Sequence, residues 1–199
     1  MSDHSKGTVL FEMIDYMKDP VEVMKKAVKY LSVQAKQKVS GCVVFDIDDT
    51  ILSSKEENSQ DYLAHNSLGK KIFDTCKKLD LPIILITART GSKCSYKYLK
   101  QQLDTLNISG YQAIYMQSTK DTDTSHYKAR IRHLLCKKYK RIVLSCGDQL
   151  TDHFDFTKLK AKDAAVVNAF FHPKTYYFIK NNKDPSVHLN LKFIDQEFD

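Results

Sequence analysis

The sequence predicts an α/β fold, a three-layer Rossmann-like arrangement in which a parallel sheet lies between two layers of helices. Two observations support this prediction. Short apolar runs rich in branched residues, such as 83–86, are typical of strands that are buried on both faces. These runs alternate with stretches of helical periodicity, and strands separated in this way are joined by right-handed crossovers in a parallel sheet.

The first predicted elements are a helix and a buried strand. Apolar residues recur at helical spacing over 21–31 and follow the start signal Asp19-Pro20. We therefore expect a helix that continues to about Lys36. The apolar run 41–45 predicts the first strand of the sheet.

The remaining elements continue the alternation. Ligands in such sheets bind beyond the carboxyl ends of the strands, so residues that directly follow predicted strands are candidates for a functional site. We expect helices at 68–79, about 92–106 and about 125–139, strands at 83–86, 113–116 and 141–145, and a last short strand at 165–168.

Length and composition favour one domain of ordinary globular type. The chain has 199 residues, enough for one sizeable core, and no stretch rich in Pro, Gly or Ser divides it. Hydrophobic residues make up 42% and charged residues 28%, which excludes a disordered or fibrous chain. The expected organisation is a single domain over 1–199, with an N-terminal helical segment at 1–38, a core at 39–182, a small cap insertion at about 53–67 after the first strand, and a C-terminal tail at 183–199.

The net charge of +7 and the pI near 9.0 favour anionic partners. The basic residues are scattered and accompany no zinc-finger or RNA-recognition signature, so nucleic acid is an open but not a favoured partner. A small phosphorylated substrate explains the sign equally well. The polar start at 1–6 leads into no long apolar segment, so we expect no secretory signal, no membrane contact and a cytoplasmic location. The sequence leaves the oligomeric state open.

The cysteines and glycines exclude several classes of enzyme. No Cys is followed six positions later by Arg, as a cysteine phosphatase requires. The six glycines supply no P-loop, and no nucleophile elbow is present. The five cysteines form no C-x-x-C pair, which argues against structural zinc and a disulfide framework, and we expect them to be reduced and mostly structural: Cys42, Cys76, Cys94, Cys136 and Cys146.

Two carboxylates two residues apart, Asp46 and Asp48, follow the first predicted strand. This pattern suits phosphoryl transfer, because one carboxylate can attack phosphorus while the other protonates the leaving oxygen. We assign the attack to Asp46 and the acid and base roles to Asp48. The alternative is an ordinary strand end that runs into a helix capped by Asp49 or Thr50.

Further polar residues follow other predicted strands or lie on a predicted helix. Asp148 can join Asp46 as a hard oxygen ligand for Mg²⁺, which offsets the repulsion between a carboxylate and a phosphate. Asp152 can bind the metal or orient its waters. Thr87 can donate its hydroxyl to a phosphate oxygen, and Lys128 can neutralise the nucleophile and the phosphate. Taken singly, Thr87 is more often a cap and Lys128 a solvated side chain.

Together these segments resemble the four ordered motifs of the haloacid dehalogenase superfamily. The resemblance implies the fold of that superfamily, an aspartyl-phosphate intermediate on Asp46, and general acid/base action by Asp48. It also implies that Mg²⁺ is held by Asp46, by Asp148 and, through its backbone carbonyl, by Asp48. The motifs are FDIDDTIL at 45–52, LITAR at 85–89, Tyr127-Lys128 with Arg132, and GDQLTD at 147–152.

The full set of predicted site residues follows from these motifs and from the strand ends. The Tyr-Lys-x-x-x-Arg pattern and the Gly-Asp-Gln of the last motif are most similar to the class B and plant-type acid phosphatase branch. The predicted residues are Asp46 and Asp48 for catalysis, Thr87, Arg89 and Lys128 for phosphate binding, and Asp46, Asp48, Asp148 and Asp152 for the metal.

The second aspartate and the short cap bear on the substrate. Dehalogenase and phosphonatase members of the superfamily lack the second aspartate, so Asp48 points to phosphomonoester hydrolysis or transfer. The short polar insertion at 53–66 leaves an open site for nucleotides, other small phosphomonoesters or a phosphorylated macromolecular end. Tyr62 and His65 are candidates for substrate contact, although surface packing is commoner for such side chains. The aromatic segment 170–177 is assigned a structural role first.

The expected function is a Mg²⁺-dependent phosphomonoester hydrolase that acts through aspartyl phosphate on small phosphomonoesters such as nucleotides. Two alternatives use the same site, a phosphotransferase and a polynucleotide 3′-phosphatase. A third is a non-catalytic protein of the same fold that binds nucleic acid or a protein partner. The acid phosphatases that the chain resembles are typically exported, whereas we expect no export signal in this chain. Their preference for acid pH is therefore not carried over.

Overall fold

A six-stranded sheet forms the centre of the computed structural model, which describes residues 12–14, 20–53, 64–92, 94–152 and 177–182. The strand order is β1-β8-β7-β2-β5-β6. Four neighbouring strands run parallel, as the sequence predicts: β7 (Ile142–Gly147), β2 (Cys42–Phe45), β5 (Ile83–Thr90) and β6 (Ala113–Gln117). The other two complete one edge: β8 (Tyr177–Asn182) is antiparallel to β7, and β1 (Glu12–Ile14) is antiparallel to β8.

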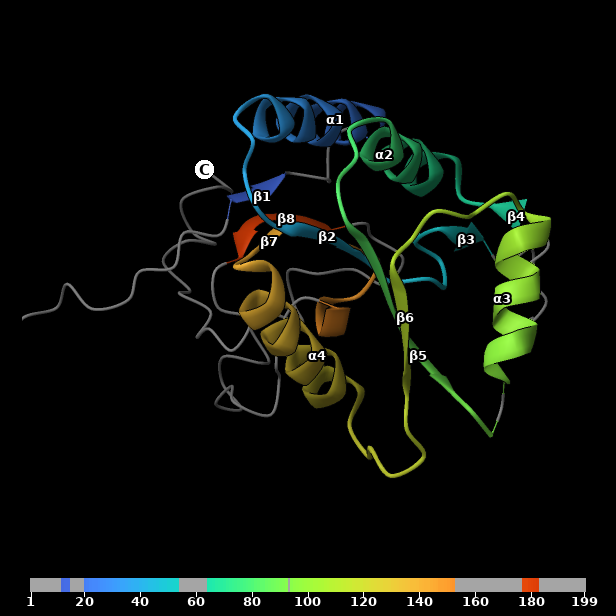
Figure 1. Ribbon diagram of the computed structural model, residues 1–199. Coiled ribbons are helices and arrows are strands. Elements are labelled where there is room, and N and C mark those ends of the chain that lie inside the picture. The colour runs from blue at the N-terminus through green and yellow to red at the C-terminus, as the bar shows by residue number, and fades with distance from the viewer. Residues whose placement is uncertain (1–11, 15–19, 54–63, 93, 153–176, 183–199) are drawn as a thin grey trace, which may run out of the picture.

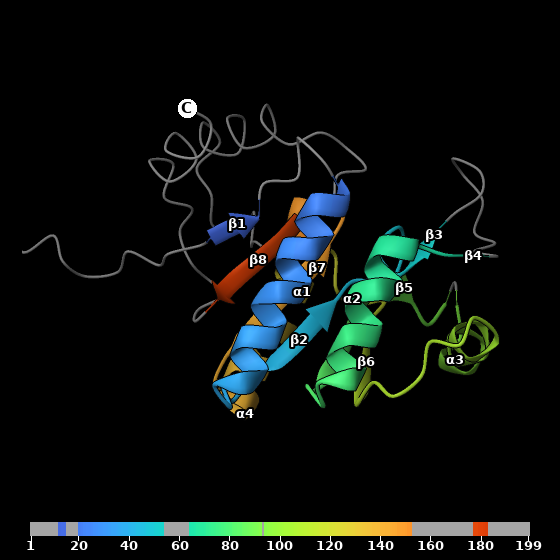
Figure 2. The ribbon, with the colours of Figure 1, turned by 90° about the horizontal axis from the view of Figure 1, so that it is seen from above.

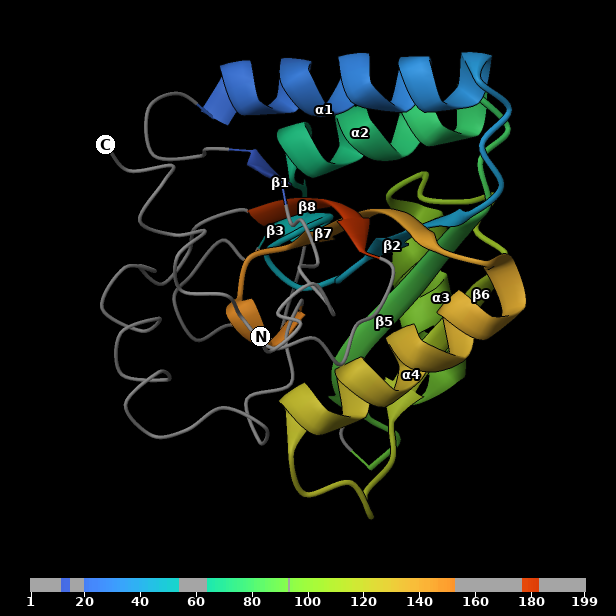
Figure 3. The same cartoon turned by 90° about the vertical axis from the view of Figure 1, so that its left-hand side faces the viewer.

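Helices cover both faces of this sheet (Figure 1). The helices α1 and α2 lie side by side on one face, and α4 lies on the opposite face (Figures 2 and 3). Beyond the edge formed by β6 lies α3 (Figures 1 and 2). No helix in the described ranges is long and apolar enough to cross a membrane. The bounds are Pro20–Lys36 for α1, Ser67–Lys78 for α2, Tyr96–Thr105 for α3 and Thr124–Tyr139 for α4.

The two layers of core follow from the alternation of side chains along the buried strands. On β2, Val43 and Phe45 join the apolar cluster under α1 and α2, whereas Cys42 and Val44 join the cluster under α4. All four are buried. Successive residues of a strand point to opposite faces, so an uninterrupted apolar run serves both layers.

Polar caps set where the helices begin. The Asn66 side chain accepts hydrogen bonds from the backbone N–H groups of Leu68 (3.0 Å) and Gly69 (3.3 Å) at the start of α2. The Ser95 hydroxyl accepts from the N–H of Tyr98 (3.1 Å). Because Ser95 caps α3, that helix begins at Tyr96 rather than at about residue 92 as the apolar periodicity predicts.

Two short strands flank the predicted cap, and they pair with each other apart from the main sheet. They are β3 (Leu52–Ser53) and β4 (Ala64–His65). His65 is exposed in β4, while Tyr62 lies outside the described residues. The predicted strand at 165–168, the tail at 183–199 and most of the aromatic segment 170–177 also lie outside them. The antiparallel strands β1 and β8 are elements that the sequence does not predict.

Candidate functional site

The chain turns sharply after β2, and this turn separates the two predicted catalytic carboxylates. The backbone N–H groups of Ile51 (3.0 Å) and Leu52 (2.9 Å) both donate to the carbonyl oxygen of Ile47. Asp49 has a φ of 55°, a left-handed conformation that Asp adopts more readily than most residues. Asp46 and Asp48 contact different partners, although they are two residues apart.

Asp46 meets a lysine from α4 in the interior. The Lys128 ammonium lies 2.5 Å from Oδ1 of Asp46 and donates a second hydrogen bond to Oδ1 of Asp152. Lys128 is only 4% exposed. One turn further along α4, the fully buried Arg132 donates to the backbone carbonyl of Asp152. Residues four apart share a helix face, so α4 presents both cations to the segment that carries Asp152.

Asp152 ends the short 3-10 helix η1 (Leu150–Asp152), and local contacts hold it in place. Its Oδ2 accepts a hydrogen bond from the backbone N–H of Gln149 (2.9 Å). A Cβ atom at Gly147 would lie 2.3 Å from this same Oδ2, so the close approach of Asp152 requires glycine there. The space that Asp152 occupies therefore explains the glycine of the Gly-Asp pair at the end of β7.

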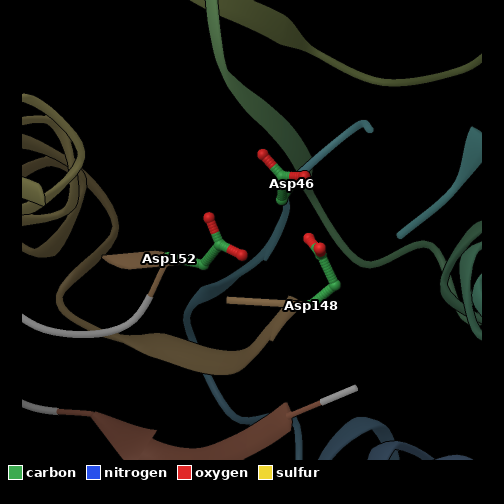
Figure 4. Close-up of side chains that lie close together, drawn as sticks. All are labelled: Asp46, Asp148 and Asp152. Carbon is green, nitrogen blue, oxygen red and sulfur yellow. The ribbon is translucent and has the colours of Figure 1, made fainter. Parts of the chain in front are cut away.

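Asp148 completes a group of three buried carboxylates. Each of Asp46, Asp148 and Asp152 offers an oxygen within 4.8 Å of the others, and Figure 4 shows the carboxyl groups converging. The Thr50 hydroxyl donates to Oδ1 of Asp148 (3.3 Å). Thr50 thus binds a site residue instead of capping a helix, which was the alternative reading of the loop after β2. The group lies where the carboxyl ends of β2 and β7 meet.

Asp48 has a different set of partners, which come from β5. Oδ1 of Asp48 lies 2.5 Å from Nη2 of Arg89, and Nε of Arg89 is 3.0 Å from both carboxylate oxygens. The Thr87 hydroxyl donates a longer bond of 3.4 Å to Oδ2 of Asp48. On its far side Arg89 donates from Nη1 to Oε1 of Gln102 in α3 (2.7 Å). A chain of polar contacts thus runs from α3 to Asp48.

An irregularity in β5 makes these contacts possible. Thr87 pairs with Met116 and Thr90 pairs with Gln117, so residues 88 and 89 are extra on the β5 side of the ladder. Such a bulge interrupts the regular alternation and redirects side chains. The Thr87 hydroxyl accepts a hydrogen bond from the backbone N–H of Arg89 (3.1 Å), which stabilises the bulge.

Comparison with known proteins adds one finding. No protein-family profile and no curated protein matches the sequence. A solved structure does match, that of a class C acid phosphatase from Bacillus anthracis with tungstate bound. It shares 16% sequence identity with a TM-score of 0.53, over 77% of this chain and 74% of that chain.

The chain has a haloacid dehalogenase fold. The α/β fold that the sequence predicts is therefore confirmed. The solved structure is described as class C, so it gives no support to the predicted class B and plant-type branch.

Electrostatics of the three carboxylates in this haloacid dehalogenase fold follow from burial and crowding. Burial raises the pKa of Asp46 well above its usual range, and Asp152, Asp148 and Asp48 raise it further, against the opposing effect of Lys128. Burial and then Asp152 raise the pKa of Asp148 to about 7. Burial lowers the pKa of Lys128, but the carboxylates of Asp152 and Asp46 outweigh it and raise the pKa, so Lys128 stays cationic. The cluster has more carboxylates than cations to balance them.

The donor set fits a hard divalent cation. Mg²⁺ prefers carboxylate oxygens, and a divalent charge would offset the crowding that raises the pKa of Asp46 and Asp148. Both oxygens of Asp152 accept hydrogen bonds, from Lys128 and from the N–H of Gln149. Asp46, Asp148 and Asp152 together offer the oxygen ligands that could hold the cation, and Asp152 is at the same time held by Lys128 and Gln149. The Asp48 carboxylate is not part of this group among the described residues.

The structure thus divides the predicted site residues into two adjoining groups. Thr87 and Arg89, predicted to bind phosphate, contact the Asp48 carboxylate directly. Sequence reasoning missed Gln102, which belongs to none of the motifs, and the part that Thr50 plays, because its partner Asp148 is 98 positions away in the chain. The first group contains Asp46, Lys128, Asp148 and Asp152, and the second contains Asp48, Thr87 and Arg89.

Proposed function

We propose that the protein is a Mg²⁺-dependent phosphomonoester hydrolase that forms an aspartyl phosphate on Asp46 and acts on small phosphomonoesters such as nucleotides. One observation carries the proposal. Asp46, at the end of a central parallel strand, is paired with the buried Lys128 and lies beside Asp148 and Asp152. A protein that only binds a partner has no need of a buried lysine shared between two carboxylates next to a third.

The environment of Asp46 suits a nucleophile. Its backbone N–H donates to the carbonyl of Cys146 (2.9 Å), which fixes the residue at the end of β2. The contact with Lys128 uses Oδ1 and orients the carboxylate, so Oδ2 is the oxygen that we assign to the attack. Mg²⁺, held by Asp46 and Asp148, would supply the positive charge that lets an anionic carboxylate approach an anionic phosphate.

The chain's own residues account for both halves of the reaction. Oδ2 of Asp46 attacks phosphorus and the bond from phosphorus to the ester oxygen breaks, while Asp48 gives its proton to that oxygen. Asp48 then takes a proton from water, whose oxygen attacks phosphorus and breaks the bond to Oδ2 of Asp46. Inorganic phosphate leaves, Asp46 regains its carboxylate and Asp48 regains its proton. Lys128 offsets negative charge during both transfers.

The small phosphorylated substrate is part of the proposal, and so is the predicted single-domain organisation. The class C description of the similar structure supports phosphatase activity in general terms. The class B and plant-type branch and the cytoplasmic location stay predictions from the sequence, which leaves the oligomeric state open.

Phosphate release tests the proposal directly. Wild type and Asp46→Asn would be assayed with p-nitrophenyl phosphate, nucleotides and sugar phosphates, with Mg²⁺ or with EDTA. We expect turnover that requires both Mg²⁺ and Asp46. The matched control is Asp74→Asn, which removes a carboxylate from a partly exposed i,i+4 pair with Lys70 on α2 and should leave the rate unchanged. An active Asp46→Asn protein would overturn the mechanism.

Product analysis separates the alternatives that share the site. A phosphotransferase would pass the phosphoryl group to an added alcohol in preference to water, and a polynucleotide 3′-phosphatase would act only on 3′-phosphorylated DNA or RNA ends. A protein that binds oligonucleotides yet shows no turnover on any of these substrates would support the non-catalytic reading.

A further inference from the structure

The contact between Asp48 and Arg89 conflicts with the roles assigned to the two residues separately. A general acid must reach the leaving oxygen of the substrate, and a phosphate-binding arginine must offer its donors to phosphate oxygens. In the structure the two side chains instead contact each other, and Nη2 of Arg89 lies 2.5 Å from Oδ1 of Asp48. Both roles can be met only when the pair separates.

We propose that Arg89 exchanges partners, holding Asp48 in the resting protein and the phosphate group in the substrate complex, and that Gln102 is the positioning residue that keeps its guanidinium in place. This inference rests on the proposed function. It concerns how the same site binds phosphate and when Asp48 becomes free to act.

The geometry of the guanidinium supports the exchange. Arg89 contacts Asp48 through the edge formed by Nε and Nη2, with Nε 3.0 Å from both carboxylate oxygens. This planar edge binds carboxylates and phosphates in the same two-pronged manner. A phosphate that carries two negative charges therefore competes with Asp48 for the same donors.

Asp48 can leave Arg89 at a small cost in free energy. The Thr87 hydroxyl is its other hydrogen-bond donor among the described side chains, at a long 3.4 Å. The Asp48 side chain is 27% exposed, compared with 7% for Asp46, so water can solvate it when it leaves Arg89. Release from Arg89 lets the Asp48 carboxylate take up a proton from water, which it needs to act as the general acid, without opening the buried cluster.

Gln102 contacts the Arg89 guanidinium on the side away from Asp48. Oε1 of Gln102 accepts from Nη1 at 2.7 Å, which is not one of the nitrogens that contact Asp48. Gln102 lies on α3, whose Leu99 and Leu103 are fully buried in the core. The guanidinium is therefore anchored to a packed helix on one side and to an exchangeable anion on the other.

Binding of inorganic phosphate tests the exchange independently of turnover. Isothermal titration calorimetry with the full chain and Mg²⁺ would compare wild type, Asp48→Asn, Arg89→Met and the double variant. Because Asp48→Asn removes the competing anion, we expect phosphate to bind about tenfold more tightly. In the Arg89→Met background the same substitution should give no more than a small change.

A neighbouring carboxylate supplies the control for charge alone. Asp49→Asn removes the same charge one residue away, and asparagine tolerates the φ of 55° found there. We expect little tightening from Asp49→Asn. Equal tightening by Asp48→Asn and Asp49→Asn, or tightening that persists without Arg89, would overturn the exchange.

Gln102 is tested with three variants on one helix. Gln102→Leu removes the acceptor, Gln102→Glu keeps one, and Gln101→Leu changes an exposed neighbour. We expect Gln102→Leu to weaken phosphate binding and to raise KM for p-nitrophenyl phosphate about fivefold, with kcat and the melting temperature nearly unchanged. Gln102→Glu should restore binding, and Gln101→Leu should behave as wild type. A loss of melting temperature with equal effects on KM and kcat would mean a structural role only.

The outcomes also separate this inference from the proposed function. A wild type that binds phosphate with the expected Arg89-dependent response to Asp48→Asn, yet hydrolyses no phosphomonoester, would retain the exchange and lose the hydrolase. Hydrolysis that depends on Asp46 without that response would retain the hydrolase and lose the exchange. A wild type with no saturable phosphate binding would overturn the exchange outright.

Discussion

Lys128 and Asp46 form a buried ion pair, with Nζ 2.5 Å from Oδ1 and side chains only 6% and 7% exposed. The same ammonium also donates to Asp152. Removing two opposite charges from water is costly, and the cost is recovered only when the pair stays intact with its other hydrogen bonds. A protein keeps such a pair where its geometry is needed, and here that geometry fixes the Asp46 carboxylate beside Asp148 and Asp152.

The first prediction concerns Lys128 itself. Lys128→Met leaves the carboxylates of Asp46 and Asp152 buried without their shared cation. We expect the free energy of unfolding of the metal-free protein at pH 8 to fall by about 3 to 5 kcal/mol, measured by urea denaturation. Phosphatase turnover should fall at least a hundredfold. The control, Lys70→Met, breaks the i,i+4 pair with Asp74, whose side chain is 40% exposed, and should cost less than about 1 kcal/mol.

The second prediction concerns the pH dependence of Mg²⁺ binding. In the metal-free protein the pKa of Asp148 is raised to about 7, so Asp148 carries a proton below that pH. Mg²⁺ needs the carboxylate, so binding must release this proton, and the apparent affinity should fall as pH drops below 7, approaching about tenfold per pH unit. Calorimetry at pH 6 in two buffers of different ionisation enthalpy measures the protons released. An affinity that is flat between pH 8 and pH 5.5 would contradict the prediction.

The raised pKa of Asp148 makes the metal-free protein more stable at low pH, whereas Mg²⁺ binding is favoured at high pH. The folded state binds a proton at Asp148 that the unfolded chain, with an ordinary aspartate, has already lost between about pH 4 and 7. The stabilisation is present below the ordinary pKa and is lost as pH rises through about 7. Metal-free protein should therefore melt at a higher temperature at pH 5.5 than at pH 8, and added Mg²⁺ should reverse the order.

Features that depend on one strand end could be predicted from the sequence. An apolar run that feeds both core layers predicts a central strand, and parallel strand ends meet at one edge. These two rules were enough to bring Asp46 and Asp148 together although they are 102 positions apart in the chain. Lys128 was harder, because its surroundings on an amphipathic helix equally suit a solvated side chain, and the family motif decided it.

Features that depend on irregular backbone could not be predicted. Asp48 lies in the turn that follows the end of β2 at Phe45, and it meets Arg89 because β5 carries extra residues between Thr87 and Thr90. Neither feature has a sequence pattern of its own. The antiparallel strand β8 was missed for a different reason: its run YFIKNN passes from apolar to polar without alternating.

The third prediction concerns the thiols. Cys42, Cys76 and Cys146 are buried, and burial raises the pKa of each, to about 12 for Cys42. Only thiolates react readily, so in native protein at pH 8 a thiol reagent should modify Cys94 and Cys136, which are partly exposed, before these three. Mass spectrometry of labelled peptides checks this order, and full labelling in urea is the control.

The raised thiol pKa values also predict a loss of stability in alkali. Above about pH 9 the unfolded chain loses thiol protons that the folded state still holds, so the unfolded state gains stability relative to the folded state. For Cys42 the loss should develop between about pH 9 and pH 12. Cys42→Ala should make the alkaline fall in melting temperature shallower, and an unchanged slope would contradict the assignment.

The last prediction uses two glycines with opposite surroundings. At Gly147 a Cβ atom would lie 2.3 Å from Oδ2 and 2.4 Å from Cβ of Asp152, so Gly147→Ala must displace Asp152 from Lys128 and from the N–H of Gln149. We expect a loss of about 1 to 3 kcal/mol in the free energy of unfolding, and a larger relative loss of phosphatase turnover because the Lys128 ammonium loses one of its two anchors. Gly91→Ala is the matched control, since nothing lies within 4 Å of a Cβ there. Urea denaturation and p-nitrophenyl phosphate hydrolysis of both variants would decide the matter: a Gly147→Ala protein as active and as stable as Gly91→Ala would show that the position of Asp152 does not matter to the site.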